Sequence, residues 1–328
     1  MNKKIKVAFI YKKDNPFVTG THFDNTYYHF LMKALPNNQD VDVANFPTGN
    51  EFDASVLKSK FDIILLWNNN PSDLPEKILG IKDVGIPIIS GVGDPVDVKK
   101  SIPYHDKWKI DYYYQYMPEQ LFYDWGYPRD FKYKSIFFGL EASLYQNVKP
   151  FKKRIKNKIL NSGAVGNLKF ISRIINYVRN PKYNSLSCYR LRTKCNELSF
   201  VDYTSTLKHK FVGDKYPLLL QKYASAIAAG TVETAMKYWE IPAAGCLTFM
   251  EITTKNKGEY LGFKDGESSI FINESNYKQK LQQYMDEPDN PKWEKIAMMG
   301  RKHALQEFNN EKASQSLVKL MKDLLIKK

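Results

Sequence analysis

Cysteine is scarce in this chain, and the few cysteines present form no recognisable binding pattern. The 328 residues contain three, Cys188, Cys195 and Cys246, and their spacing matches no zinc-ligand motif. An odd number also leaves one thiol over if two of them pair. We therefore expect reduced cysteines with a structural role and no metal site.

Long apolar runs are also missing. No stretch approaches the roughly 18–20 residues that cross a bilayer. Near the start, Lys3 and Lys4 precede the apolar run Ile5–Tyr11, as in a signal peptide, but Lys12 ends the run and no small-residue cleavage site follows. We expect this run to be a buried strand, and the protein to be cytoplasmic or peripheral at the inner membrane face.

Signatures of dinucleotide and nucleic-acid binding are lacking too. No Gly-x-Gly-x-x-Gly follows the first expected strand, which argues against a dehydrogenase, and no motif of a DNA- or RNA-binding fold occurs. The formal net charge is nevertheless +14, with its densest basic segment from Lys149 to Lys158. That charge fits lysines spread over every solvated face, an anionic membrane or phosphorylated lipid, or nucleic acid. We expect no nucleic-acid partner.

Apolar and aromatic residues are plentiful, at 43% and 14% of the chain. With this length they favour two domains of about 150 residues each. In the first half, Phe61–Trp67 is apolar on both faces, as in a central strand of a parallel sheet. The patterns there predict strands at Ile5–Ile10, Val41–Phe46, Phe61–Trp67, Ile86–Ser90, Ile110–Tyr114 and Ser135–Phe138, and helices at Thr21–Leu35, Pro75–Leu79 and Met117–Trp125.

The same alternation restarts in the second half. Strands are predicted at Lys158–Asn161, Leu198–Asp202, Ala224–Ala229, Cys246–Met250 and Ser269–Ile272, and helices at Lys169–Val178, Pro217–Tyr223, Met236–Ala244, Tyr277–Met285, Trp293–Phe308 and Ala313–Ile326. The sequence therefore predicts an α/β protein with two Rossmann-like, doubly wound domains that face a central cleft. The predicted boundaries are 1–145, 146–310 and a terminal helix at 311–328, which we expect to pack back on the first domain. Such a fold is shared by dehydrogenases, binding proteins and transferases, so function must come from site residues.

The most informative segment runs from Lys237 to Gly245, where a helix bearing Glu240 ends in a glycine before a short strand. One fixed carboxylate can accept hydrogen bonds from both hydroxyls of a ribose, and Lys237 lies on nearly the same helical face. The same residues would also suit an ordinary amphipathic helix with a surface ion pair and a capping glycine.

This segment resembles the C-terminal domain of GT-B glycosyltransferases, in which Lys-x-x-Glu-x-x-Ala-x-Gly binds the nucleotide. Among family 1/4-like enzymes it is most similar to the CgeB-like (spore maturation protein) branch. The similarity also covers the connector Phe138–Glu141 and the segments 216–220, 224–227, 261–272 and 296–304.

The resemblance implies a glycosyltransferase that uses a nucleoside-diphosphate sugar as donor and retains the anomeric configuration. It implies no cofactor and no divalent metal. The acceptor would be a glycan, a lipid-linked molecule or a protein. Glu240 would hold the ribose, within a nucleotide site that includes Gly245.

The resemblance further implies a diphosphate site near Lys237 and the glycine turn after the second domain's first strand. That turn contains Gly163 and Ala164, and Arg173 lies in the helix that follows. A glycine turn at a helix N-terminus attracts phosphate through backbone N–H groups. One departure concerns the transferred sugar, because Val232 stands where many relatives carry a carboxylate. Either Glu233, one residue later, serves as that catalytic carboxylate, or the sugar is held differently.

In the first domain, His22 and Asp94 follow strands one and four and are candidates for a catalytic base or an acceptor-binding group. A helix-start histidine and a turn-forming Asp-Pro are the structural alternatives. The aromatic residues of 111–116 and 122–127 would form a core or a sugar-stacking platform. Two other functions remain open: a non-catalytic nucleotide-sugar binder, and a basic protein of membrane surfaces or nucleic acids.

Overall fold

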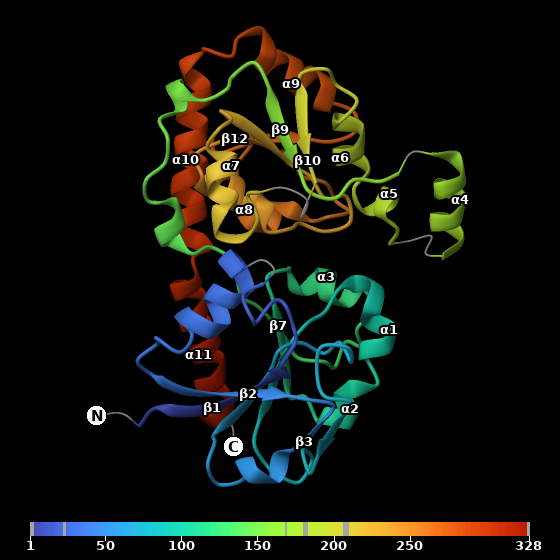
Figure 1. Ribbon diagram of the computed structural model, residues 1–328, viewed down its shortest axis with the longest axis vertical. Coiled ribbons are helices and arrows are strands. Elements are labelled where there is room, and N and C mark those ends of the chain that lie inside the picture. The colour runs from blue at the N-terminus through green and yellow to red at the C-terminus, as the bar shows by residue number, and fades with distance from the viewer. Residues whose placement is uncertain (1–2, 22–23, 168, 180–182, 206–209, 327–328) are drawn as a thin grey trace. The chain divides into compact units, whose positions relative to one another are not determined.

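The computed structural model describes residues 3–21, 24–167, 169–179, 183–205 and 210–326 (Figure 1). Internal contacts divide the chain into two compact units. Unit 1 consists of Met1–Gly139 together with Asn310–Lys328, and unit 2 of Leu140–Asn309. In the described part of the chain, no helix is long and apolar enough to cross a membrane.

Unit 1 contains a six-stranded parallel sheet with the order β2-β1-β4-β6-β7-β8. Its central strands are buried on both faces, which explains their continuous apolar sequences. A separate parallel pair joins β3 to β5. The strands are β1 (Ile5–Lys12), β2 (Val41–Thr48), β3 (Glu51–Asp53), β4 (Ile63–Leu66), β5 (Lys77–Leu79), β6 (Ile88–Gly91), β7 (Tyr112–Gln115) and β8 (Tyr133–Ser135).

The helices of unit 1 are short except for the first and the last. The first, η1, is a π-helix, and the last, α11, is contributed by the C-terminal end of the chain. They are η1 (Asp24–Ala34), η2 (Ala54–Leu57), η3 (Pro95–Asp97), α1 (Val98–Ser101), α2 (Tyr104–Trp108), α3 (Glu119–Asp124) and α11 (Asn310–Ile326).

Helix α11 packs against η1 and is tied to unit 1 by specific bonds. Asn310 Oδ1 accepts a hydrogen bond from the Gly139 backbone N–H at 2.7 Å, and the Asn38 side chain donates to Ser314 Oγ at 3.2 Å. The inward face of α11, which includes Leu317 and Met321, is buried. The last helix is therefore part of the N-terminal unit.

Unit 2 contains a five-stranded parallel sheet with the order β10-β9-β11-β12-β13. Its strands are β9 (Ile159–Ser162), β10 (Val201–Thr204), β11 (Ser225–Ala228), β12 (Leu247–Glu251) and β13 (Ile270–Ile272). Its helices are η4 (Ala142–Tyr145), η5 (Phe151–Lys153), α4 (Phe170–Arg179), α5 (Ser185–Cys188), α6 (Arg190–Cys195), η6 (Gly213–Lys215), α7 (Tyr216–Leu220), α8 (Lys237–Ala243), η7 (Gly258–Leu261), α9 (Tyr277–Asp286) and α10 (Pro291–Glu307).

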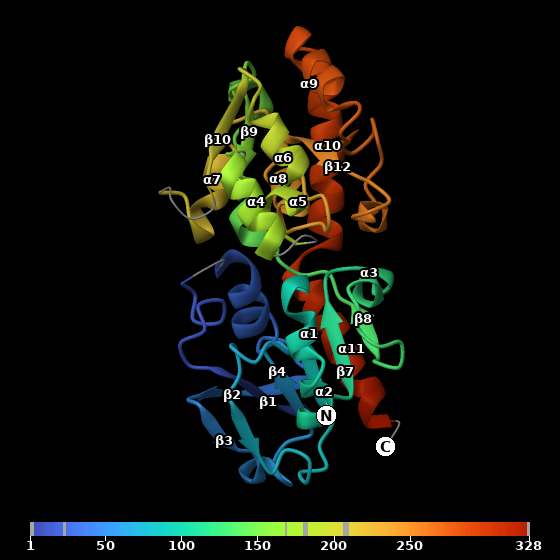
Figure 2. The same ribbon diagram turned by 90° about the vertical axis from the view of Figure 1, so that its right-hand side faces the viewer.

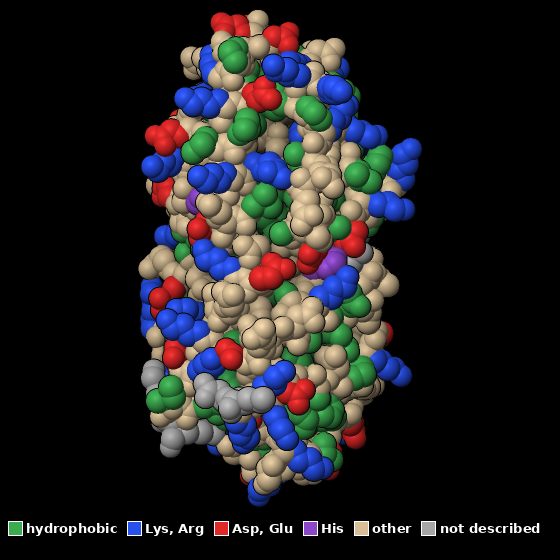
Figure 3. Space-filling model, turned by 90° about the vertical axis from the view of Figure 1, so that its left-hand side faces the viewer, with side chains coloured by type: hydrophobic (Ala, Val, Ile, Leu, Met, Phe, Trp, Pro, Cys, Tyr) green, Lys and Arg blue, Asp and Glu red, His purple; other side chains and the backbone are tan. Residues whose placement is uncertain are grey.

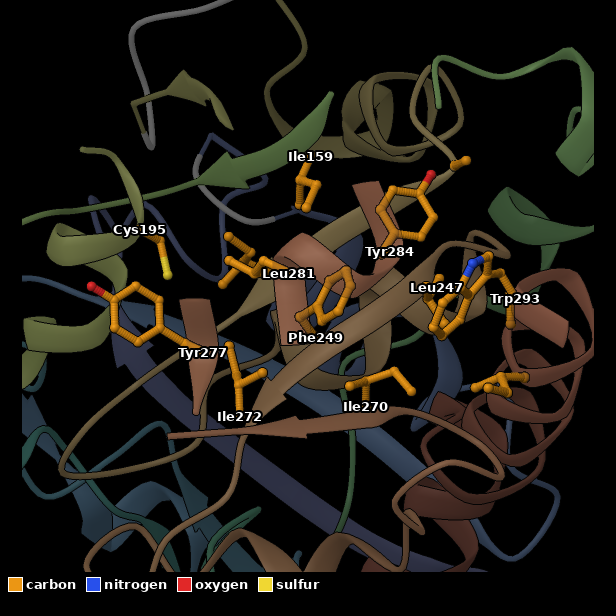
Figure 4. Close-up of a cluster of buried hydrophobic side chains, with 14 of the residues drawn as sticks. Ile159, Cys195, Leu247, Phe249, Ile270, Ile272, Tyr277, Leu281, Tyr284 and Trp293 are labelled. Atoms are coloured by element: carbon orange, nitrogen blue, oxygen red, sulfur yellow. The ribbon is translucent and has the colours of Figure 1, made fainter. Parts of the chain in front are cut away.

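The core of unit 2 lies between this sheet and the helices that follow it in the chain (Figure 4). Phe249 from β12 meets Tyr284 from α9 edge to face at 5.9 Å, and Trp293 from α10 packs beside them. Ile159 and Leu281 complete the same cluster. These contacts join the sheet to α9 and α10.

The predicted alternation of strands and helices, and the two doubly wound sheets, are confirmed. The strand predicted at Ser135–Phe138 lies earlier in the chain, because β8 is Tyr133–Ser135. One predicted helix was wrong: the end of Pro75–Leu79 forms strand β5, because pairing with β3 and the ion pair between Lys77 and Glu51 at 2.6 Å outweigh a short helical signal. The aromatic residues of 111–127 form core rather than a platform, since Tyr113, Phe122 and Tyr127 are buried against one another.

Candidate functional site

The carboxyl ends of β9 and β11 diverge at one point of the unit 2 sheet. The connection from β10 to β11 crosses over β9, so the winding direction of the sheet reverses between β9 and β11. Ligands of doubly wound proteins bind at such a switch point. Here the chain leaves β9 at Gly163 and β11 at Ala229.

Gly163 is the residue on which the other side chains converge. Its φ is +103°, and a Cβ there would lie 2.5 Å from Lys237 Nζ and 3.1 Å from Arg192 Nη1. Only glycine combines this backbone conformation with such close approach of two cations. Its own N–H donates to the Thr204 carbonyl at 2.9 Å, and the Gly166 N–H donates to Thr193 Oγ1 at 2.8 Å. Gly163 therefore lets the two cations approach the turn closely. The N–H groups of Gly163 and Gly166 already donate hydrogen bonds within unit 2.

Arg192 bridges the two diverging loops. Its Nη1 donates to the Ala164 carbonyl at 2.9 Å, its Nη2 donates to the Ala229 carbonyl, and its guanidinium lies over the Tyr189 ring at 4.6 Å. The side chain is buried, and burial lowers its pKa. Sequence reasoning missed Arg192, because only burial distinguishes it from the neighbouring cations Arg190 and Lys194.

Lys237 is the first residue of α8 and reaches across to the end of β9. Its ammonium donates to the Ser162 carbonyl oxygen. Burial, and next the charge of Arg192, lower the pKa of Lys237 well below its ordinary value, while Glu240 acts in the opposite direction. The site thus presents two adjacent cations, of which Arg192 is buried and Lys237 half-buried. Such a pair attracts an anion such as a diphosphate.

Glu240 lies one helical turn after Lys237 and is only 7% exposed. Burial raises the pKa of the Tyr216 hydroxyl, and the charge of Glu240 raises it further. That hydroxyl is 2.6 Å from Ser162 Oγ. A buried carboxylate one helical turn from a lysine can accept hydrogen bonds from a ligand's hydroxyls.

Gly245 follows the C-terminal end of α8. It lies eight residues after Lys237, which corresponds to roughly 12 Å along the helix axis. Its φ is +74°, and a Cβ would lie 3.1 Å from Arg154 Nη2. The structure therefore brings Gly163, Ala164, Lys237 and Glu240 together and gives Gly245 the role of ending the helix.

The loop from Gly230 to Met236 covers the end of β11. A Cβ on Gly230 would lie 2.3 Å from the Glu233 carbonyl oxygen, and Asn256 donates to the Gly230 carbonyl at 2.8 Å. Val232 is buried in this loop and Glu233 is half-buried. Burial raises the pKa of Tyr260, and so does the charge of Glu233.

Glu251 ends β12 beside the same loop and is 1% exposed. Burial raises its pKa to about 7, although Thr231 and the charge of Arg192 act in the opposite direction. Among the described residues, its Oε2 atom has no hydrogen-bond partner. A carboxyl group at the end of an apolar strand gave no sequence signal of its own.

The remaining predicted site residues lie elsewhere. His22 is outside the described residues, and Arg173 belongs to α4 with its side chain outside the description. Asp94 is exposed in unit 1, where it precedes η3.

Within the described residues, no group of three or more His, Cys, Asp and Glu side chains could hold a metal ion. The Asp-Val-Asp triplet at residues 40–42 has two carboxylates at a spacing that could suit a metal ion. It lies at the amino end of β2, away from the carboxyl edge where doubly wound sheets bind ligands, and Asp40 pairs with Lys322 at 2.7 Å.

No protein-family model matches the sequence, and no curated protein has a matching sequence. Solved structures match over nearly the full chain. HepE from Anabaena, in complex with UDP-glucose, gives a TM-score of 0.58 at 11% identity over 97% of this chain and 100% of that chain. Sucrose-phosphate synthase from Thermosynechococcus elongatus gives 0.59 at 10% identity over 99% and 100%. A glycosyltransferase from Rickettsia africae gives 0.59 at 12% identity over 99% of both chains. At these identities the likeness establishes the fold, and this chain has the GT-B fold of those glycosyltransferases.

Proposed function

We propose that this chain is a glycosyltransferase that moves a sugar from a nucleoside-diphosphate sugar to an acceptor. The observation that carries the proposal is the convergence of Lys237 and Arg192 on Gly163, at the switch point of unit 2. A buried arginine and a half-buried lysine beside a glycine turn suit a diphosphate. Glu240, one helical turn from Lys237, suits the ribose hydroxyls that lie next to that diphosphate.

The chemistry follows from where charge develops. Breaking the glycosidic bond to the donor leaves a nucleoside diphosphate, so negative charge grows on the leaving oxygens in the transition state. Lys237 and Arg192 are held in place by backbone carbonyl groups before the donor arrives, and they need little reorganisation to stabilise that charge. With two fixed cations in this role, we propose transfer without a divalent metal.

The finer features of the proposal rest on the sequence. We propose a CgeB-like, retaining enzyme that acts in the cytoplasm or at the inner membrane face. The acceptor would be a glycan, a lipid-linked molecule or a protein, and His22, Asp94 and Glu233 are the proposed catalytic or acceptor-side residues. Arg173 is retained as a further diphosphate contact and Gly245 as part of the nucleotide site. UDP is the first nucleotide to test, because HepE binds UDP-glucose.

A second function is favoured by one observation. Val232 is buried where relatives carry a carboxylate that contacts the sugar. A protein without that contact could bind a nucleotide-sugar and transfer nothing.

The test is thermal unfolding with UDP, GDP, ADP, CMP and dTDP, on the wild type and on Glu240→Gln. A ligand at about 100 times its dissociation constant stabilises a protein by about 2.7 kcal/mol. We expect one nucleotide to stabilise the wild type and not Glu240→Gln. The matched control is Glu267→Gln, which changes an exposed carboxylate that pairs with Lys264 at 3.6 Å, and it should respond like the wild type.

Turnover separates the two functions. Release of the free nucleotide from the cognate sugar donor, measured with and without acceptor extracts, should be detectable for an enzyme. Stabilisation by nucleotide without any release from a panel of donors would favour the binder. If no nucleotide stabilises the protein, the proposed donor site is wrong.

A further inference from the structure

Helix α4 exposes several large apolar side chains to solvent. It stands apart from the unit 2 sheet with α5 beside it, and it faces the viewer in the second view (Figures 1 and 2). Phe170 is 74% exposed and Val178 is 76% exposed. The exposed apolar residues of this ten-residue helix are Phe170, Ile171, Ile174, Ile175, Tyr177 and Val178.

These residues occupy one side of the helix. At 100° per residue, the six apolar positions fill a continuous arc of roughly 160°. The sequence assigns the remaining arc to Ser172, Arg173, Asn176 and Arg179. An exposed apolar arc in a helical sequence whose remaining positions are polar or basic is typical of helices that lie in a membrane interface.

The charge of the surrounding sequence points the same way. Residues 142–196 contain 13 lysines and arginines and no aspartate or glutamate, whereas the rest of the chain carries 36 basic and 35 acidic residues. Thus nearly all of the net charge of +14 comes from one sixth of the chain. On the face in Figure 3, by contrast, basic and acidic side chains are mixed.

Part of this charge is used inside unit 2. Arg154 and Arg192 are buried, Lys156 pairs with Asp289, and Lys194 pairs with Glu274. The segment 169–182 around α4 contributes four cations, Lys169, Arg173, Arg179 and Lys182, without a single acidic residue. The exposed apolar residues and these four cations therefore fall within the same short stretch of sequence, residues 169–182.

We propose that α4 docks the protein on the surface of a membrane that contains anionic phospholipid. The apolar arc would enter the boundary between headgroups and acyl chains, and the flanking cations would contact lipid phosphates. Ten residues span only about 15 Å, so the helix would lie in the interface and not cross it. Nucleic acid is disfavoured as the occupant, because it offers nothing to cover six exposed apolar side chains.

Docking through α4 would supply the membrane contact of the proposed transferase, and its biological role rests on that proposed function. A membrane-docked transferase would meet a lipid-linked acceptor on a surface. The docking itself can be measured without donor or acceptor, so failure of either proposal is seen separately.

The experiment is sedimentation of the full chain with vesicles of phosphatidylcholine alone, or with one third phosphatidylglycerol. We expect binding to the anionic vesicles and much weaker binding to the neutral ones. The double variant Phe170→Ser/Val178→Ser should lose about tenfold or more in vesicle affinity, because both side chains are exposed and their apolar surface would be buried only on the membrane. Met298→Ser, also at an exposed apolar residue (65%), is the matched control and should bind like the wild type.

The charge arm compares Arg179→Gln/Lys182→Gln with Lys152→Gln/Lys153→Gln, which removes the same charge from exposed positions in the other basic segment. Only the first pair should weaken binding strongly. Three results would overturn the proposal: no binding of the wild type to either vesicle, equal loss from both charge pairs, or a dimer in solution that Phe170→Ser/Val178→Ser dissociates. The last would identify a second copy of the chain as the occupant of α4.

Discussion

The ammonium of Lys237 donates a hydrogen bond to the carbonyl oxygen of Ser162, which fixes the start of α8 against the end of β9. An ammonium has three N–H groups, so this bond orients Lys237 and leaves capacity for ligand oxygens. The bond also holds the half-buried charge of Lys237 beside that of the buried Arg192, which is costly without an anion. The pair is therefore prepared for a diphosphate.

Replacing Lys237 by methionine should remove a donor that acts on the leaving group. We expect a loss in turnover of about a hundredfold, or about 3 kcal/mol, and weaker UDP binding, with the fold retained. Steady-state kinetics with the cognate donor measures the first effect, and calorimetry measures the second. Unchanged turnover would mean that Lys237 only supports the turn at Ser162.

Proton uptake offers an independent test of the same lysine. The bound anion should raise the lowered pKa of Lys237, so UDP binding should take up protons at alkaline pH. Calorimetry in two buffers of different protonation enthalpy would detect this uptake in the wild type and find it reduced in Lys237→Met. Proton release in the wild type would contradict the assignment.

Gly163→Ala should damage the donor site more than the fold. A positive φ costs about 1–3 kcal/mol for a residue with a Cβ, and the new methyl group would also displace Lys237 Nζ, 2.5 Å away. Gly266 is the matched control, because its φ is +72° and no atom lies within 4 Å of a Cβ there. Urea unfolding should show similar losses in both variants, whereas only Gly163→Ala should lose UDP binding. Equal UDP binding by the alanine variants at Gly163 and Gly266 would show that Gly163 is not part of the donor site.

Arg192→Lys should destabilise unit 2. A lysine cannot bond both the Ala164 and the Ala229 carbonyl groups, and a buried carbonyl without a partner costs about 1–3 kcal/mol. Arg190→Lys, in the same helix, changes an exposed side chain that pairs with Glu274 at 3.2 Å, and it should alter the free energy of unfolding by less than about 0.5 kcal/mol. Similar stability of both variants would show that Arg192 does not brace the two loops.

The fold was largely predictable because buried parallel strands leave long apolar signals and the connecting helices leave periodic ones. Phe61–Trp67 identified β4 in this way. Strand β5 was not predictable, because three residues carry no period and their pairing with β3 is a tertiary contact.

The site was only partly predictable, for a related reason. Gly163, Lys237 and Glu240 have local sequence patterns that indicate a turn and a ligand-bearing helix. Arg192 and Glu251 owe their importance to burial beside loops distant in sequence, and no local pattern reports that burial. Whether a cation lies on the surface or in a site is decided by packing.

Glu251 makes the stability of the protein depend on pH. Its pKa is raised from the ordinary value of 4.5 to about 7, so between these values the folded state binds more protons than the unfolded state. Stability should therefore fall as pH rises from about 4.5 to about 7, by an amount on the order of 3 kcal/mol, and then change little from this group. Glu251→Gln keeps the shape of the side chain and cannot ionise, so the free energy of unfolding should lose this part of its pH dependence. Urea titrations of both proteins at pH 5 and pH 8 measure the difference. If the two proteins lose stability in parallel between these pH values, Glu251 is ionised in the folded protein throughout, and Arg192 compensates its charge fully.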